Sequence, residues 1–202
     1  MTKRIGIYVF DQVEALDFAG PYEVFTTAAR MFAREYPAEP ALFEVVTLGA
    51  TGSPVHARAG LKIEPDCTLA AHPPLDCVVL PGGVVDAEMT RAELSAWIRA
   101  QLARGTLTAS VCTGAFLLAG VGALDGREAT THWEDMPELR ERFPRVTVRE
   151  GVRWVDLGQI VTSAGISAGI DMSLHLVERL HSRALAERTA RQMVFDWTQN
   201  GA

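Results

Sequence analysis

Long hydrophobic runs and an excess of basic residues are both absent from this sequence. Nowhere in its 202 residues do about 18 apolar residues follow one another, so no membrane-spanning helix is expected. The N-terminus has no apolar stretch followed by a cleavage site, which predicts a cytoplasmic protein without a signal peptide. The net charge is −6 and no basic patch is visible, which argues against nucleic-acid binding.

Cysteine is scarce as well, with three residues: Cys67, Cys77 and Cys112. An odd number without a signal peptide is typical of reduced thiols rather than of a disulfide framework. No two of them have the short spacing of a structural zinc site, so no metal is expected. Any one of them could be a small buried hydrophobic residue, and two of the three are expected to be no more than that.

The composition is that of one globular domain. Hydrophobic residues make up 48% and charged residues 22% of the chain, close to globular averages. A chain of this length can build one full hydrophobic core but not two of ordinary size. No internal repeat, low-complexity tract or linker interrupts it. We therefore expect a single domain over residues 1–202.

Strand-like and helix-like segments alternate along the chain. Apolar runs rich in β-branched residues predict buried strands, and apolar residues three and four apart predict helices. Pro21 is expected in the first turn of the first helix, where its missing N–H costs no hydrogen bond. The expected strands are 5–10, 43–48, 77–80 and 106–111, the expected hairpins are 55–63 and 152–162, and the expected helices are 17–36, 91–104, 112–118, 167–180 and 184–197.

This alternation predicts an α/β fold of the flavodoxin-like kind. Its sheet is expected to be doubly wound and mostly parallel, with helices on both faces. In such sheets ligands bind at the carboxyl ends of the strands. The segments that reach this edge are therefore candidates for a functional site.

The segment from Ser110 to Gly114 joins a buried strand to a helix without a loop, with Cys112 at the junction. A sharp turn of this kind, followed by small residues, is typical of a nucleophile elbow. The dipole of the helix that begins there lowers the pKa of a thiol and favours the thiolate. A lone cysteine is more often a packed core residue, but this context favours a nucleophile.

Two further segments reach the same edge. Gly82 and Gly83 follow the strand 77–80, and the N–H groups of Gly83 and Thr113 could form a donor pair for an oxyanion. Asp17 begins the first helix and by default is a helix cap. Beside Cys112, like charge and burial would raise the pKa of its carboxyl and make it a proton donor and acceptor near neutral pH.

Two other features have open interpretations. His132 could be a base, but nothing in the sequence places it beside Cys112, and packing against Trp133 is the alternative. The segment 163–171 is rich in small residues, which could let its backbone border the pocket while Ile166 supplies an apolar wall. Close packing of helix on sheet explains this segment equally well.

Together these motifs resemble the ThiJ/PfpI superfamily, whose fold resembles class I glutamine amidotransferases. The resemblance extends from Ile5 to about Trp197. Cys-Thr-Gly followed by Thr-Thr-His-Trp is most similar to isocyanide hydratases and to the sensor domains of AraC-type regulators. Peptidase-like members carry a histidine after the cysteine, where this chain has Thr113, so the resemblance does not imply a Cys–His peptidase dyad. The segments that carry it are 14–21, 80–83, 110–115, 129–133 and 162–171.

The resemblance to isocyanide hydratases implies a lyase that needs no cofactor. The Cys112 thiolate would attack the terminal carbon of an isocyanide to give a thioimidate, Asp17 would exchange protons, and water would release an N-substituted formamide. The resemblance also implies a homodimer with the first helix near the partner chain. The other site residues that it implies are Thr113, Gly82, Gly83, His132, Ala164, Gly165 and Ile166.

Two other functions stay open. The first is a ligand-sensing or regulatory domain. Such a domain is not expected to bind DNA by itself, because AraC-type regulators append a helix-turn-helix region and none is visible before Ala202. A stress protein could use Cys112 on aldehyde adducts or to sense oxidants, since an accessible low-pKa thiol oxidises selectively. A narrow apolar cavity beside Cys112 would favour a small linear substrate, and a wide polar one would favour something else.

Overall fold

A seven-stranded sheet forms the centre of the computed structural model, which describes residues 1–199. Its strand order is β10-β11-β7-β6-β1-β2-β5, and all neighbours pair in parallel except the hairpin of β10 and β11. This confirms the predicted mostly parallel, doubly wound sheet. The strands are β1 (Lys3–Tyr8), β2 (Phe43–Gly49), β5 (Cys67–Thr68), β6 (Cys77–Leu80), β7 (Leu107–Val111), β10 (Trp154–Asp156) and β11 (Ile160–Ser163).

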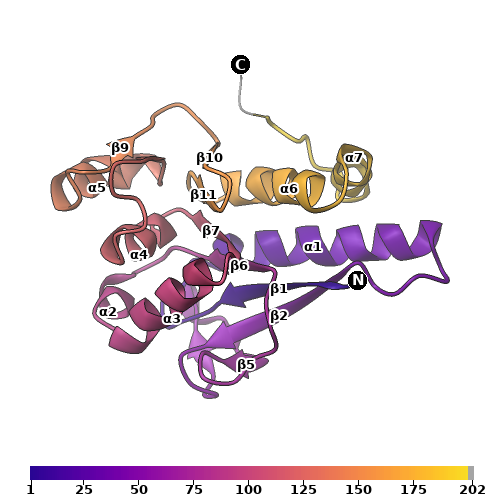
Figure 1. Cartoon of the computed structure of the whole chain (residues 1–202), viewed down its shortest axis with the longest axis horizontal. Helices are drawn as coiled ribbons and strands as arrows, with labels where there is room; N and C mark the ends of the chain where they lie inside the picture. Colours follow the sequence, from indigo (N-terminus) through magenta and orange to yellow (C-terminus); the bar gives the residue numbers. More distant parts are fainter. Residues whose placement is uncertain (200–202) are drawn as a thin grey trace.

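Helices cover both faces of this sheet (Figure 1). The chain runs from β1 outward to β2 through α1, and from β6 in the opposite direction to β7 through α3. Because crossovers between parallel strands are right-handed, these two connections place their helices on opposite faces. Helices α1 (Ala15–Glu35), α6 (Ala168–Leu180) and α7 (Arg183–Gln192) pack together, and α2 (Asp86–Met89), α3 (Ala92–Ala103) and α4 (Gly114–Gly120) form the other layer.

The strand order reverses between β1 and β6, which lie side by side near the middle of the sheet. Each is buried along most or all of its length, because its apolar side chains contact a helix layer on either face. The loops that leave these two strands at their carboxyl ends diverge, and this divergence leaves a crevice where ligands bind in such folds. The fold therefore places the segments after Tyr8, Leu80 and Val111 around one point.

Short elements complete the described part of the chain. The predicted hairpin near residue 60 is present as β3 (Val55–His56) and β4 (Lys62–Ile63), joined by a 3-10 turn, Arg58–Gly60. A small parallel pair, β8 (Glu128–Ala129) and β9 (Thr147–Val148), flanks the turn Trp133–Asp135 and helix α5 (Met136–Arg142). The sequence did not predict α2, α5, β5, β8 or β9, which are all short. No helix within residues 1–199 is both long and apolar enough to cross a bilayer.

Two predicted helix boundaries are wrong. Helix α1 begins at Ala15, so Pro21 lies in the body of the helix and not in its first turn. The helix continues past it because Pro21 removes only one hydrogen bond, to the carbonyl four residues earlier. The last helix ends at Gln192 rather than at Trp197. Val194 has a left-handed φ of 52°, and the chain after it turns back onto α6.

We call residues 193–199 the C-terminal strap. Its Trp197 indole donates a hydrogen bond to the carbonyl of Asp171, and the Thr198 N–H donates to the Asp171 carboxylate at 2.8 Å. Asp171 is fully buried and also accepts hydrogen bonds from Arg153. Met193, Phe195 and Trp197 of the strap pack partly buried against the core from a non-helical backbone, although the sequence predicted a helix here.

Candidate active site

Cys112 lies at a sharp elbow between β7 and α4. Its φ is 55°, in the left-handed region that non-glycine residues rarely adopt and that a nucleophile elbow imposes. The turn is tight because the backbone of Gly114 passes under Leu80; a Cβ on Gly114 would lie 2.0 Å from the Leu80 carbonyl oxygen. The Cys112 N–H donates to Ser163 O, and the Thr131 hydroxyl donates to Cys112 O at 2.8 Å. The neighbouring segments therefore hold this strained residue on both sides.

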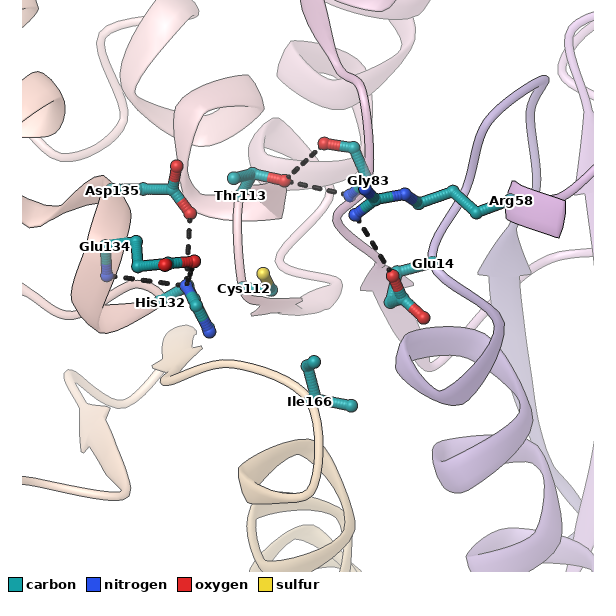
Figure 2. Close-up of a pocket in the computed structure, with 9 residues that line it drawn as sticks. All are labelled: Glu14, Arg58, Gly83, Cys112, Thr113, His132, Glu134, Asp135 and Ile166. Atoms are coloured by element: carbon teal, nitrogen blue, oxygen red, sulfur yellow. Dashed lines mark hydrogen bonds and ion pairs between the residues drawn. The ribbon is translucent and has the colours of Figure 1, made fainter.

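A cavity of about 270 Å³ opens above the sulfur (Figure 2). Its lining is mostly polar, with carboxylates, one guanidinium and one imidazole around the thiol, and Ile166 is its large apolar side chain. The cavity is thus small but not the apolar slot that would favour a linear apolar substrate. The lining residues are Glu14, Arg58, Gly83, Cys112, Thr113, His132, Glu134, Asp135 and Ile166.

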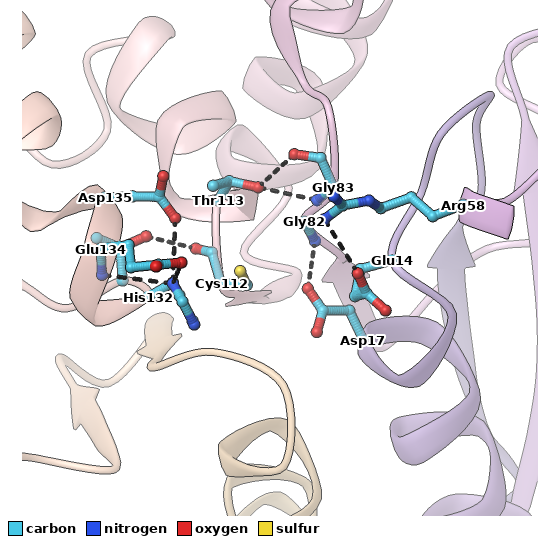
Figure 3. Close-up of polar contacts among 11 residues, drawn as sticks. Glu14, Asp17, Arg58, Gly82, Gly83, Cys112, Thr113, His132, Glu134 and Asp135 are labelled. Carbon is cyan, nitrogen blue, oxygen red and sulfur yellow. Dashed lines mark hydrogen bonds and ion pairs between the residues drawn. The ribbon is translucent and has the colours of Figure 1, made fainter.

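Asp17 lies in the first turn of α1, close to the elbow, and is fully buried (Figure 3). Its Oδ2 accepts a hydrogen bond from the Gly82 N–H at 3.0 Å, while its Oδ1 has no hydrogen-bond partner among the described residues. Burial raises the pKa of this carboxyl to about 7, although the Gly82 N–H and the Cys112 side chain both favour its charged form. Asp17 can therefore give and take a proton near neutral pH.

The thiol of Cys112 does not have the lowered pKa that the helix terminus predicted. Burial, followed by the charge of Asp17, raises the pKa of Cys112 to about 12, against the Thr113 N–H that favours the thiolate. The prediction of a resting thiolate is therefore wrong. At neutral pH the pair holds a proton on sulfur, and Asp17 is the group placed to remove it.

The predicted oxyanion donor pair is also incomplete. The Gly83 N–H donates to the Thr113 hydroxyl at 2.9 Å, and that hydroxyl donates back to Gly83 O at 2.9 Å. The Gly83 N–H is thus occupied, and the Thr113 N–H, which acts on the sulfur, is the donor that the elbow offers. The exchange of hydrogen bonds instead locks the loop after β6 onto the start of α4.

The structure brings most of the predicted site residues together. One group lines the cavity, and a second group lies directly behind the lining. Cys112, Thr113, Gly83, His132 and Ile166 line it. Asp17 and Gly82 lie behind this lining and are joined by the hydrogen bond described above.

Three residues predicted to bind substrate do not line the cavity: Gly82, which lies behind the lining, Gly165 and Ala164. Gly165 packs against the imidazole of His132, where a Cβ would lie 2.0 Å from Cδ2. Ala164 follows β11 and its N–H donates to Arg153 O. Ile166 does supply an apolar wall, as predicted, while Gly169 packs closely on the sheet, where a Cβ would lie 2.8 Å from Val111 Cγ1, so both interpretations of this segment hold in part.

His132 is held at the cavity by two acidic residues. Its Nδ1 lies 3.5 Å from an Asp135 oxygen and 3.7 Å from a Glu134 oxygen. Burial raises the pKa of Asp135, and His132 opposes this shift. The preceding Thr131 binds the carbonyl of Cys112, which is how the Thr-Thr-His segment reaches the elbow.

Sequence reasoning missed the residues on the rim: Glu14, Arg58, Glu134 and Asp135. Glu14 lay inside a segment that resembled the superfamily, and the two acids follow His132 directly, so these had a signal in the sequence. Arg58 had none, because it comes from the β3–β4 hairpin, whose position relative to β7 cannot be read from local patterns. Among residues 1–199 no group of three or more His, Cys, Asp or Glu side chains could hold a metal ion.

Comparison with known proteins identifies the family. The family model described as DJ-1/PfpI matches residues 3–179. The chain belongs to the DJ-1/PfpI family. Like other members it is similar to proteins of different functions, so membership of this family fixes the fold and not the activity.

Curated relatives of this DJ-1/PfpI chain include both regulators and an enzyme. It is 32% identical over 199 residues to the HTH-type transcriptional regulator GbdR of Pseudomonas aeruginosa, covering 98% of this chain and 52% of the regulator. It is 33% identical over 181 residues to the isonitrile hydratase of Pseudomonas putida, covering 89% of this chain and 73% of the hydratase. The chain thus spans about half the length of the regulator and most of the enzyme.

Solved structures support the same assignment. A ThiJ/PfpI family protein from Pseudomonas syringae superposes with a TM-score of 0.83 at 27% identity, covering 97% of this chain and 76% of that chain. Drosophila melanogaster DJ-1beta superposes with a TM-score of 0.83 at 22% identity, covering 98% of this chain and all of that chain, which shows the shared fold.

Proposed function

We propose that this DJ-1/PfpI protein is a cysteine-dependent lyase that hydrates a small isocyanide to an N-substituted formamide. The observation that carries the proposal is the buried Asp17 carboxyl, with its pKa near 7, acting on the Cys112 thiol at a strained elbow. The 33% identity with isonitrile hydratase supports the choice of substrate class. The cavity volume of about 270 Å³ suits a small molecule.

The first half of the reaction forms a bond to sulfur. The Asp17 carboxylate accepts the proton of Cys112 while the sulfur bonds to the terminal carbon of the isocyanide. Asp17 then gives this proton to the same carbon, which leaves a neutral thioimidate on Cys112. Proton transfer through one positioned carboxyl is effective here because its pKa is close to the operating pH.

The second half consumes water. Asp17, again a carboxylate, takes a proton from the water that adds to the thioimidate carbon, and the substrate nitrogen becomes protonated. The carbon–sulfur bond then breaks, the carbonyl of the formamide forms, and the sulfur recovers its proton. The sum is one isocyanide and one water converted to one formamide. The Thr113 N–H stabilises the sulfur at each step in which the sulfur carries a negative charge.

Turnover of an alkyl isocyanide tests the proposal. Wild-type protein is expected to produce the formamide, detected by mass spectrometry, and Cys112→Ala is expected to lose at least about 100-fold in kcat/KM. Cys67→Ala is the matched control, because Cys67 lies in the edge strand β5 away from the cavity. Equal rates in wild type and Cys112→Ala would contradict the proposal.

A sensing role is the second candidate, favoured by the polar lining. A cavity rimmed by Glu14, Arg58, Glu134 and Asp135 can bind a charged small molecule without reacting with it. The 32% identity with a transcriptional regulator supports this role. Absence of formamide from every isocyanide tested would remove the hydratase and leave the sensor. Oxidant sensing is less favoured, since burial keeps Cys112 a thiol.

A further inference from the structure

An ion pair closes one side of the cavity mouth. Arg58 Nη1 donates to Glu14 Oε2 at 3.3 Å, which joins the β3–β4 hairpin to the residue that precedes α1. Figure 2 shows this pair on one side of Cys112, with His132 and its acidic neighbours on the other. Neither Glu14 nor Arg58 has a part in the reaction steps above.

A short chain of contacts connects the pair to the reactive acid. The Glu14 N–H donates to Gly82 O at 2.9 Å, and the Gly82 N–H donates to Asp17 Oδ2 at 3.0 Å (Figure 3). Glu14 also lies three residues before Asp17, on the same side of the helix start. The position of Glu14 therefore bears directly on the Asp17 carboxylate.

Asp17 faces few charges, so each one matters. Glu14 acts on it from the position just before α1 and Arg58 from the hairpin. The Cys112 thiol acts from the elbow and the Gly82 N–H from the loop after β6. Asp135 lies on the far side and acts on Cys112. Because Asp17 is fully buried, these charges are weakly screened. The charge of Glu14 opposes ionisation of Asp17, and the charge of Arg58 favours it.

The ion pair is not needed to attach the hairpin. Main-chain hydrogen bonds already do this, from Gln12 N to His56 O at 2.7 Å and from Arg58 N to Val13 O at 3.0 Å. The guanidinium is half exposed, and exposed ion pairs contribute little to stability. A purely structural role therefore leaves this pair without an evident purpose.

We propose that Glu14 and Arg58 are positioning residues that set how readily Asp17 takes the proton of Cys112. The inference rests on the proposed use of the acid–thiol pair. Glu14 keeps Asp17 in its protonated form to higher pH, and Arg58 limits this effect by pairing with Glu14. The balance of the two charges decides the pH at which the sulfur becomes reactive.

Alkylation of Cys112 by iodoacetamide tests this without any isocyanide. The sulfur displaces iodide, a carbon–sulfur bond forms, and the thiol proton leaves through Asp17 to solvent. The rate at Cys112, followed by peptide mass mapping between about pH 5 and 9, is expected to rise with a midpoint near the Asp17 pKa of about 7. Mapping separates Cys112 from the half-buried Cys67.

The two charges should move this midpoint in opposite directions. Glu14→Gln is expected to lower the midpoint by about 0.5–1 pH unit, and Arg58→Gln is expected to raise it by a similar amount. Arg58→Lys keeps the positive charge and should therefore keep the wild-type midpoint. Glu23→Gln and Arg30→Gln are matched controls, because these residues form an ion pair on the exposed side of the same helix. Both controls should leave the midpoint unchanged.

Two outcomes separate this inference from the proposed function. A wild-type midpoint near 7 that neither Glu14→Gln nor Arg58→Gln moves, in variants with native circular dichroism, would overturn the positioning role and leave the acid–thiol pair standing. A wild-type profile with no rise near 7, unchanged in Asp17→Asn, would overturn the acid–thiol pair and the inference with it.

Discussion

At the scale of single residues, the site is a compromise between reactivity and stability. Asp17 is buried with one oxygen unpaired, and Cys112 adopts a backbone conformation that non-glycine residues avoid. Such features reduce the free energy of unfolding and persist where the surrounding structure enforces them. Their coincidence at one crevice is the strongest physical argument that this crevice has a function.

Replacement of Asp17 by asparagine should stabilise the protein while reducing its reactivity. The folded-state pKa of about 7 exceeds the ordinary value of 3.8, so the folded protein binds the extra proton between these pH values and loses stability as pH rises through 7. At pH 8 the charged carboxylate costs of the order of 4 kcal/mol, and the neutral amide removes this cost. Thermal unfolding is expected to show a gain in Tm for Asp17→Asn at pH 8 that shrinks toward pH 4. An equal gain at both pH values would contradict the assignment.

At the scale of elements, the site depends on close contacts between loops that are distant in the sequence. The strand-to-helix elbow, the glycine pair after β6 and the acid at the start of α1 were predictable, because each has a local pattern and parallel strands bring their carboxyl ends together. The contribution of Arg58 to the cavity and the non-helical strap over 193–199 were not predictable from the sequence, because both depend on tertiary packing. The pKa of Cys112 was misjudged because burial outweighs the helix dipole.

Gly165→Ala tests the contact between the loop after β11 and His132. The added Cβ would lie 2.0 Å from Cδ2 of His132, so the imidazole must move, and a loss of about 1–3 kcal/mol in the free energy of unfolding is expected. Urea denaturation measures this loss. Gly52→Ala is the control, because a Cβ there meets only Thr68 at 3.9 Å and should change stability by less than about 0.5 kcal/mol. Equal stability of the two variants would show that the loop adapts freely.

At the scale of the whole molecule, we propose a homodimer with α1 at the interface. Leu16 and Tyr22 expose apolar side chains on this helix, next to the residues that shape the site. Sedimentation equilibrium is expected to give twice the chain mass of 21.9 kDa. Leu16→Asp should shift the mass toward that of the monomer, while Val194→Asp, at an already exposed position of the strap, should not. A wild-type monomer at all concentrations would exclude the dimer.

The elbow has a consequence for how the protein matures during synthesis. Its sulfur stands at residue 112, its acid at residue 17, and the carbonyl that anchors its backbone at Ser163. A nascent chain that has emerged only as far as β7 therefore carries an ordinary cysteine, without the partners that hold the strained turn. The proton exchange between this thiol and Asp17 therefore becomes a property of the chain only after β11 has joined the sheet and holds the turn in place.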